Sequence, residues 1–154
     1  MKEIKFRGRD DEGRWIYGNY VRYTEDDGSE VSCIVSKERC EISAELTFEE
    51  VGLETVCQFT GLKDKNGEEI YEGDIIKITE NYNGESSFSE VKFLKGVFGV
   101  ENWTKGSKNE SLTTLNFFMP TIGLYDDEQE YSICIVGNVF DNPELLNKVI
   151  CLTM

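Results

Sequence analysis

The chain has 154 residues, of which 39% are hydrophobic and 30% charged, enough for one folded domain with a core. Thirty acidic and 16 basic side chains with no histidine give a net charge of −14. This charge repels polyanions at long range and therefore disfavours nucleic acid as a partner. The lack of histidine also excludes any nucleophilic triad that uses a histidine base.

The charge is unevenly distributed along the chain. Residues 1–22 hold six basic and four acidic groups, so they carry +2 while the rest carries −16. A solvated acidic surface accounts for this distribution, and a docking face for a basic partner is the alternative. Since 30 carboxyl groups are available, no single acidic pair can be chosen as a catalytic pair.

No targeting or membrane segment is recognised. The first 15 residues carry charges throughout, and no run approaches the roughly 20 apolar residues of a membrane helix. We therefore expect a cytoplasmic protein without a membrane partner. The five cysteines are odd in number and irregularly spaced, so we expect no disulfide framework: Cys33, Cys40, Cys57, Cys134 and Cys151. Cys33, Cys57 and Cys134 lie among apolar residues and are expected to be core thiols; no metal site and no cofactor are expected.

Strand signals dominate the chain. Runs rich in aromatic and β-branched residues predict strands over 14–23, 31–35, 54–60, 89–94, 97–103 and 131–136. Gly18 is a candidate bulge, and Lys95-Gly96 a candidate two-residue hairpin connection. Residues 82–87 and 105–111 are expected to be loops. The best helix candidate is short and C-terminal, beginning near Asn142-Pro143-Glu144, where Asn can cap the first turn.

The most informative segment is Cys57–Ile78, which predicts two strands around Asp64-Lys65-Asn66-Gly67. Either a type I turn closed by a left-handed Gly67 or an Asn-Gly type I′ turn fits, and both join antiparallel strands. Leu62 and Ile70 flank the turn as natural cross-strand partners. Gly73-Asp74 breaks the run, and a new strand follows with Ile76 and Ile78 on one face. The segment is not an EF-hand calcium loop, because Leu62 and Gly73 would occupy its first and twelfth positions, which need side-chain oxygen ligands.

Three blocks of the chain resemble the YopX family, which is encoded by bacteriophages and prophages of Gram-positive bacteria. They are Lys5–Gly8 with Gly13–Gly18, Gln58–Ile78, and Ile135–Asn138 with Asn142–Leu146. The resemblance implies a phage or prophage origin, a bacterial host cytoplasm and an SH3-like β-barrel with additional strands. It implies no reaction and supplies no catalytic residues.

The fold class expected from these observations is all-β, in a single YopX-like domain over residues 1–154 with a C-terminal subregion from about residue 85. Family-motif residues are the candidates for partner binding: Trp15, Tyr17, Gly61, Asp64, Asn66, Gly67, Tyr71, Gly73 and Asp74. The alternative is that these glycines and aspartates serve only to form turns.

We expect a non-enzymatic accessory protein that acts by binding an unidentified protein or by self-association as a homo-oligomer. The aromatic strand Trp15–Tyr23 offers a surface for such contact. The alternative is an acidic, nucleic-acid-mimicking decoy that binds a basic host protein.

Overall fold

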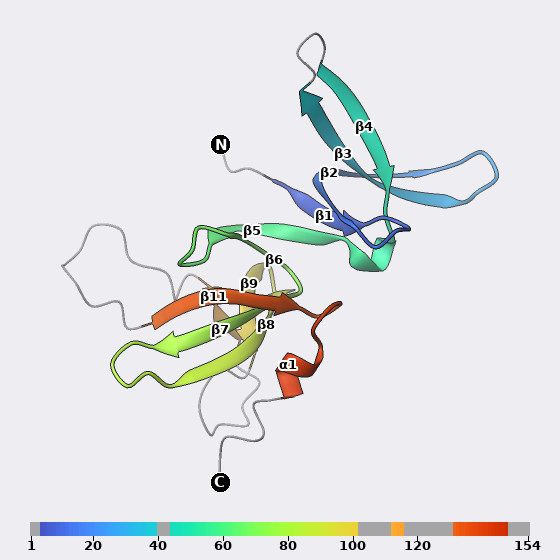
Figure 1. The fold of residues 1–154 in the computed structure, drawn as a ribbon. Helices are drawn as coiled ribbons and strands as arrows, with labels where there is room; N and C mark the ends of the chain where they lie inside the picture. The colour runs from blue at the N-terminus through green and yellow to red at the C-terminus, as the bar shows by residue number, and fades with distance from the viewer. Residues whose placement is uncertain (1–3, 40–43, 102–111, 116–130, 148–154) are drawn as a thin grey trace. The chain divides into compact units, whose positions relative to one another are not determined.

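The computed structural model describes residues 4–39, 44–101, 112–115 and 131–147, and this part of the chain is mainly β (Figure 1). The strands are β1 (Phe6–Arg9), β2 (Trp15–Thr24), β3 (Glu30–Arg39), β4 (Ala44–Glu50), β5 (Cys57–Lys63), β6 (Glu69–Tyr71), β7 (Asp74–Glu80), β8 (Ser86–Leu94), β9 (Val97–Glu101), β10 (Leu112–Thr114) and β11 (Tyr131–Asn138). A 3-10 helix, η1 (Leu53–Thr55), and a short helix, α1 (Glu144–Asn147), accompany them. The all-β expectation is confirmed at this level.

The strands form two antiparallel sheets. The first has the order β4-β3-β2-β1-β5-β6 and the second the order β10-β9-β8-β7-β11. Within the described residues each order is open, with a strand at either end that has one neighbour. The SH3-like barrel therefore stays a prediction.

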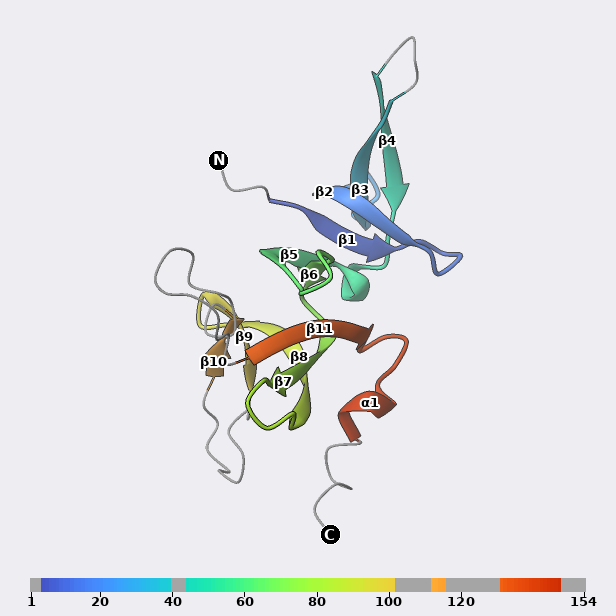
Figure 2. The same cartoon turned by 60° about the vertical axis from the view of Figure 1, so that its left-hand side comes forward.

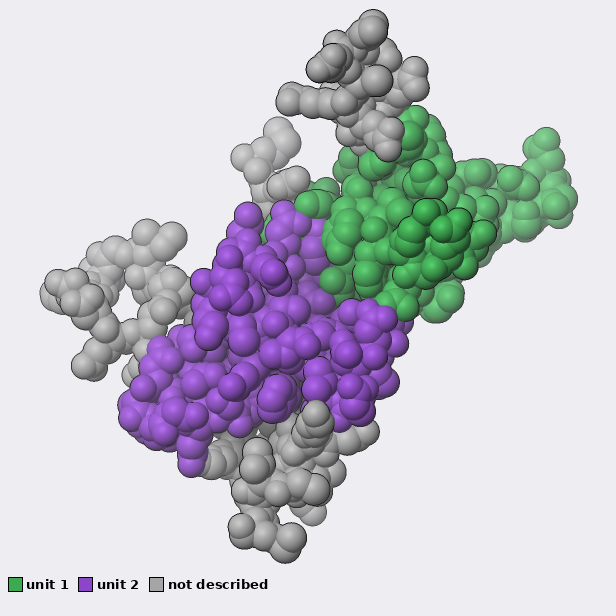
Figure 3. Space-filling view, viewed as in Figure 1, with its two compact units in different colours: residues 1–61 green, residues 62–154 purple. Residues whose placement is uncertain are grey.

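The chain divides into two compact units, residues 1–61 and 62–154, which Figure 3 colours separately. The boundary falls inside β5, so the turn after this strand belongs to the second unit. The subregion expected from the sequence begins near residue 85, whereas the second compact unit begins at residue 62. Whether the whole chain is one folding domain stays a prediction.

One turn design recurs in three hairpins. The carbonyls of Asp10, Glu25 and Asp64 accept bonds from the N–H groups three residues later, at 3.1, 2.9 and 3.0 Å. Those donors are Gly13, Gly28 and Gly67, with φ of +79°, +89° and +84°. Only glycine occupies this left-handed region freely, which explains the spacing in the sequence. At Lys95-Gly96 both φ angles are positive, as in a type I′ turn, so the predicted two-residue connection between β8 and β9 is confirmed.

Gly18 is needed for a close backbone approach rather than for a bulge. β2 pairs with β1 over its first residues, up to Gly18, and with β3 from Asn19 onward. Neither pairing has the register shift that a bulge would cause. A Cβ atom at Gly18 would lie 2.2 Å from the carbonyl oxygen of Val35. The bulge expectation is replaced by a steric requirement for glycine.

The core of the second unit comes mainly from β-branched side chains. Its buried members are Ile70, Ile76, Ile78, Val91, Val100, Leu115 and Ile133. Ile76 and Ile78 enter it together, as their alternation predicted, and Leu62 packs against it. α1 begins as expected, since the N–H of Leu145 donates to the carbonyl of Asn142 at 3.0 Å.

Several boundaries differ from expectation. The strand predicted from residue 54 begins at Cys57, because residues 53–55 form η1. β8 begins at Ser86, inside a stretch expected to be loop, because β7 supplies a partner for these polar residues. The loop expected over 105–111 lies outside the described residues. Of the helices that the structure describes, none has the length and apolar character to cross a membrane.

Candidate functional site

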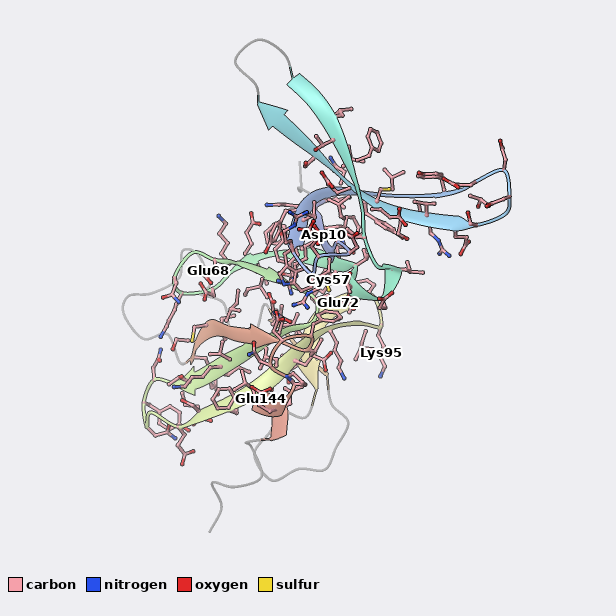
Figure 4. All side chains as sticks on the ribbon, turned by 45° about the vertical axis from the view of Figure 1, so that its right-hand side comes forward. Asp10, Cys57, Glu68, Glu72, Lys95 and Glu144 are labelled. Carbon is pink, nitrogen blue, oxygen red and sulfur yellow. The ribbon has the colours of Figure 1, made fainter. Side chains whose placement is uncertain are left out.

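The motif turn is a type I turn closed by Gly67 in the left-handed conformation. The N–H of Gly67 donates to the carbonyl of Asp64 at 3.0 Å, and the N–H of Asp64 donates to the carbonyl of Glu68 at 2.8 Å. Gly67 has φ +84°, and Asn66 is not among the positive-φ residues, so the type I′ alternative is excluded. Asn66 and Gly67 are exposed between β5 and β6, which confirms the predicted turn tip; Figure 4 labels Glu68 at its end.

The buried carboxylate of Asp64 organises this turn. Oδ1 accepts the backbone N–H groups of Asn66 and Glu68 at 2.8 and 3.0 Å. Oδ2 accepts the side-chain amide of Asn66 at 3.3 Å and the backbone N–H of Ile135 at 3.0 Å. Burial raises the pKa of this carboxyl group, but the hydrogen bonds outweigh it and hold the pKa below its ordinary value. Asp64 is therefore an anion at neutral pH.

The same turn also contacts the outer edge of β11. Besides the Ile135 bond to Asp64, the N–H of Lys65 donates to the carbonyl of Ile133 at 3.0 Å. β11 pairs with β7 on its other side, and the two strands lie side by side in Figures 1 and 2. The second motif block thus binds the strand that carries the third block.

The second motif turn, after β6, makes a further connection between these blocks. The N–H of Tyr71 donates to Oδ2 of Asp74 at 2.7 Å, and the phenol donates to Oε2 of Glu69 at 2.8 Å. Gly73 has φ +77°, donates to the carbonyl of Val91 at 2.8 Å and accepts from the N–H of Val139 at 2.9 Å. Tyr71, Gly73 and Asp74 are buried, so their observed contacts are structural.

The motif residues of the first unit have a different setting. The Trp15 ring lies beneath two guanidinium groups, with the Cζ atoms of Arg7 and Arg9 at 4.5 and 4.7 Å from its centroid. Tyr17, on the same strand, is 45% exposed. Gly61 is exposed with φ +85° at the end of this unit. Partner binding by the motif residues stays a prediction.

Several exposed apolar side chains lie on one face of the sheet formed by β2, β3 and β4. The register aligns Asn19 with Val35 and Phe48 across the three strands, and side chains two residues apart share a face. We call the exposed apolar members of this face the aromatic face: Tyr17, Val21, Tyr23, Leu46 and Phe48, which are 38–62% exposed. β3 contributes the buried Cys33 and Val35 between them.

Sequence reasoning found only half of the aromatic face. The aromatic run of β2 was recognised, whereas β4 was not predicted. The signal was present in β4, because Ala44, Leu46 and Phe48 alternate with polar residues in the pattern of a half-buried strand. The face becomes recognisable only when the pairing register of β3 is known.

The cysteines in the described residues do not form a reactive site. Cys33 and Cys57 are buried, as expected of core thiols, while Cys134 is half-buried. Burial raises the pKa of the Cys33 thiol, and the nearby Glu50 carboxylate raises it by a smaller amount. The thiol is therefore protonated at neutral pH. Cys40 and Cys151 lie outside the described residues. In the part of the chain that the structure describes, no cluster of three or more cysteine and acidic side chains could hold a metal ion.

These features define a protein of two antiparallel sheets in which two sequence motifs are hydrogen-bonded together around β11. The family model described as "YopX protein" matches residues 5–147, and the chain belongs to this family.

Individual relatives agree with the family assignment. The chain is 36% identical over 84 residues to the SPbeta prophage-derived uncharacterized protein YopX of Bacillus subtilis (strain 168), an alignment that covers 54% of each protein. Its fold resembles the crystal structure of protein YopX from Bacillus subtilis, with TM-score 0.54 and 23% identity over 95% of this chain and 99% of the other. A crystal structure of a protein from Enterococcus faecalis gives TM-score 0.50 and 27% identity, with the same coverages.

Proposed function

We propose that this protein is a non-enzymatic phage or prophage accessory protein that acts by protein binding through the aromatic face, with a second copy of the chain as its partner. The observation that carries the proposal is the gathering of Tyr17, Tyr23 and Phe48 on one sheet face with 45%, 45% and 62% of their surfaces exposed. Tyrosine and phenylalanine are enriched in protein interfaces because each supplies a large contact area.

The size of the aromatic face supports this role. A covered aromatic side chain buries about 150–250 Å², so the three aromatic residues together leave roughly 300 Å² open. Patches of about 300–600 Å² are the largest on typical monomers and are often functional. A stable interface needs about 800 Å² per partner. The aromatic face therefore requires an additional contact to hold a partner.

The edge of β4 supplies that additional contact. β4 is the last strand of the first sheet, and its pairing with β3 extends without a shift over seven residues. The N–H of Val51 donates to the carbonyl of Ser32, and by alternation the backbone groups of Leu46 and Phe48 point away from β3. Antiparallel pairing of β4 with β4 of a second copy can place Leu46 opposite Phe48 and make the two aromatic faces continuous.

The acidic decoy is the second candidate, and one observation favours it. The β2–β3 turn presents Glu25, Asp26 and Asp27, all exposed. A complex held by such charges weakens steeply with salt, whereas an apolar interface does not. Salt dependence of any complex therefore separates the two candidates.

We further propose an SH3-like arrangement for the five-stranded second sheet and a location in the cytoplasm of a bacterial host. The consecutive antiparallel strands β7, β8 and β9 support the first proposal. The family membership supports the second, since a homologue is encoded by a prophage.

Light scattering of the full chain with a Phe48→Glu variant tests the proposed function. Tyr82→Glu is the matched control, because Tyr82 is 76% exposed and lies outside the aromatic face. We expect the native chain and Tyr82→Glu to give a larger average mass with rising concentration, and Phe48→Glu to stay monomeric. A native chain that is monomeric and binds a basic protein in a salt-sensitive way would instead support the decoy.

A further inference from the structure

The outer edge of β11 is covered at its centre by the motif turn. β11 ends the second sheet, so one side of the strand lies beyond its pairing with β7. On that side, the carbonyl of Ile133 accepts the Lys65 N–H and the N–H of Ile135 donates to the Asp64 carboxylate, both at 3.0 Å. Two successive outward-facing positions of the strand are therefore bonded to a turn rather than to another strand.

The covered segment has the composition of a strand that pairs with copies of itself. Residues 131–136 read YSICIV, without charge, proline or glycine. Segments of six or seven residues with high β-propensity and low net charge form stacked sheets when their edges are exposed. A second copy of this segment is thus the most suitable partner for an uncovered β11.

The edge contact is not required by the turn itself. The β1–β2 turn has the same geometry, and Oδ1 of Asp10 accepts the N–H groups of Glu12 and Arg14 just as Asp64 accepts those of Asn66 and Glu68. The other oxygen of Asp10 binds the Arg14 side chain of its own turn at 2.7 Å. In the motif turn, the corresponding oxygen binds β11 in addition to the Asn66 side-chain amide of its own turn.

We propose that Asp64 and Lys65 form an edge guard that prevents β11 from pairing with β11 of a second copy. The guard occupies the donor at Ile135 and the acceptor at Ile133, the groups that a pairing strand would use. This role goes beyond the proposed binding through the aromatic face and concerns the other unit.

The test uses the full chain with Phe48→Glu, which removes association through the aromatic face. Asp64→Ala and Lys65→Pro are then added together. Proline suits the second position of a type I turn, so Lys65→Pro removes the N–H donor while favouring the turn. The matched control is Asp10→Ala with Asp11→Pro, the same two changes in the β1–β2 turn.

Sedimentation velocity at about 100 μM, within the range where exposed strand edges associate, provides the first readout. We expect the Asp64→Ala/Lys65→Pro variant to form dimers or larger species and the control variant to stay monomeric. Adding Val136→Lys should restore the monomer, because Val136 is 37% exposed in β11 and lysine blunts strand edges.

Hydrogen exchange of the Ile76 and Ile78 amides provides the second readout, since both residues lie in the buried core. Retained protection shows that the second unit is folded while β11 is uncovered. Two results would overturn the proposal: a folded variant that stays monomeric, or loss of protection in β7, which would make the turn a requirement for folding.

Discussion

The backbone N–H of Ile135 donates a hydrogen bond to Oδ2 of Asp64 at 3.0 Å, although 71 positions of sequence separate the two residues. This bond joins the motif turn to the strand that carries the next motif block. With this bond, the buried carboxylate accepts three backbone N–H groups. Loss of the carboxylate should therefore destabilise the contact with β11 as well as the turn.

Asp64→Asn should lower the free energy of unfolding at pH 7 by about 1–3 kcal/mol, because a buried donor left without its charged acceptor costs that much. The Asn amide replaces one acceptor oxygen by a donor, so it cannot serve all the groups that the carboxylate serves. Urea melts of the two proteins check this prediction.

The same pair of proteins tests the pH dependence. The folded pKa of Asp64 lies below its ordinary value, so its contribution is fully present above the unfolded pKa, about 3.9, and is lost as the pH falls through the folded pKa. The stability difference between the native chain and Asp64→Asn should therefore be constant near neutrality and shrink in acid. A difference that grows in acid would contradict the assigned hydrogen bonds.

Gly67→Val should destabilise the second unit by about 1–3 kcal/mol, the cost of holding a β-branched residue in a strained backbone region. A Cβ atom at Gly67 meets nothing within 4 Å, so any loss reports the backbone conformation alone. Gly67→Asn is the control and should lose less, since asparagine tolerates positive φ. An unchanged denaturation midpoint for the valine variant would refute the turn assignment.

Gly18→Ala should destabilise the first unit by about 1–3 kcal/mol or more, as overpacking does. The added Cβ would lie 2.2 Å from the backbone carbonyl oxygen of Val35. A backbone carbonyl held in a sheet cannot relieve this clash by changing rotamer, as a side chain can. Asn19→Ala, at the next and exposed position of β2, should be close to neutral. Equal melting temperatures for the two variants would show that β3 does not approach β2 as closely as described.

The sequence was sufficient to predict the features that depend on local chemistry. Asp64 and Gly67 predict a tight turn, because an aspartate side chain bonds backbone amides a few residues ahead and glycine adopts a positive φ freely. Both effects act within the four residues of the turn. The β8–β9 connection at Lys95-Gly96 and the start of α1 at Asn142 follow from similar rules. The choice between turn types could not be made, since both place Gly67 at positive φ.

Features that depend on distant partners could not be predicted. No local pattern indicates that Asp64 binds Ile135, because that bond arises from the placement of β11. The aromatic face was recognised only through β2, since the exposure of Leu46 and Phe48 depends on how β4 pairs with β3. The sequence predicts a bulge at Gly18, because the close neighbour that requires glycine there, Val35, lies on another strand.

Hydrogen exchange of the Leu46 and Phe48 amides, measured across protein concentration, tests the central claim most directly. These amides point away from β3, so they should exchange rapidly in the dilute monomer and slowly once β4 pairs with a second copy. We expect protection that rises with concentration in the native chain and in Tyr82→Glu, and that is absent in Phe48→Glu. Exchange at these two amides that is the same at every concentration would contradict self-association through the aromatic face.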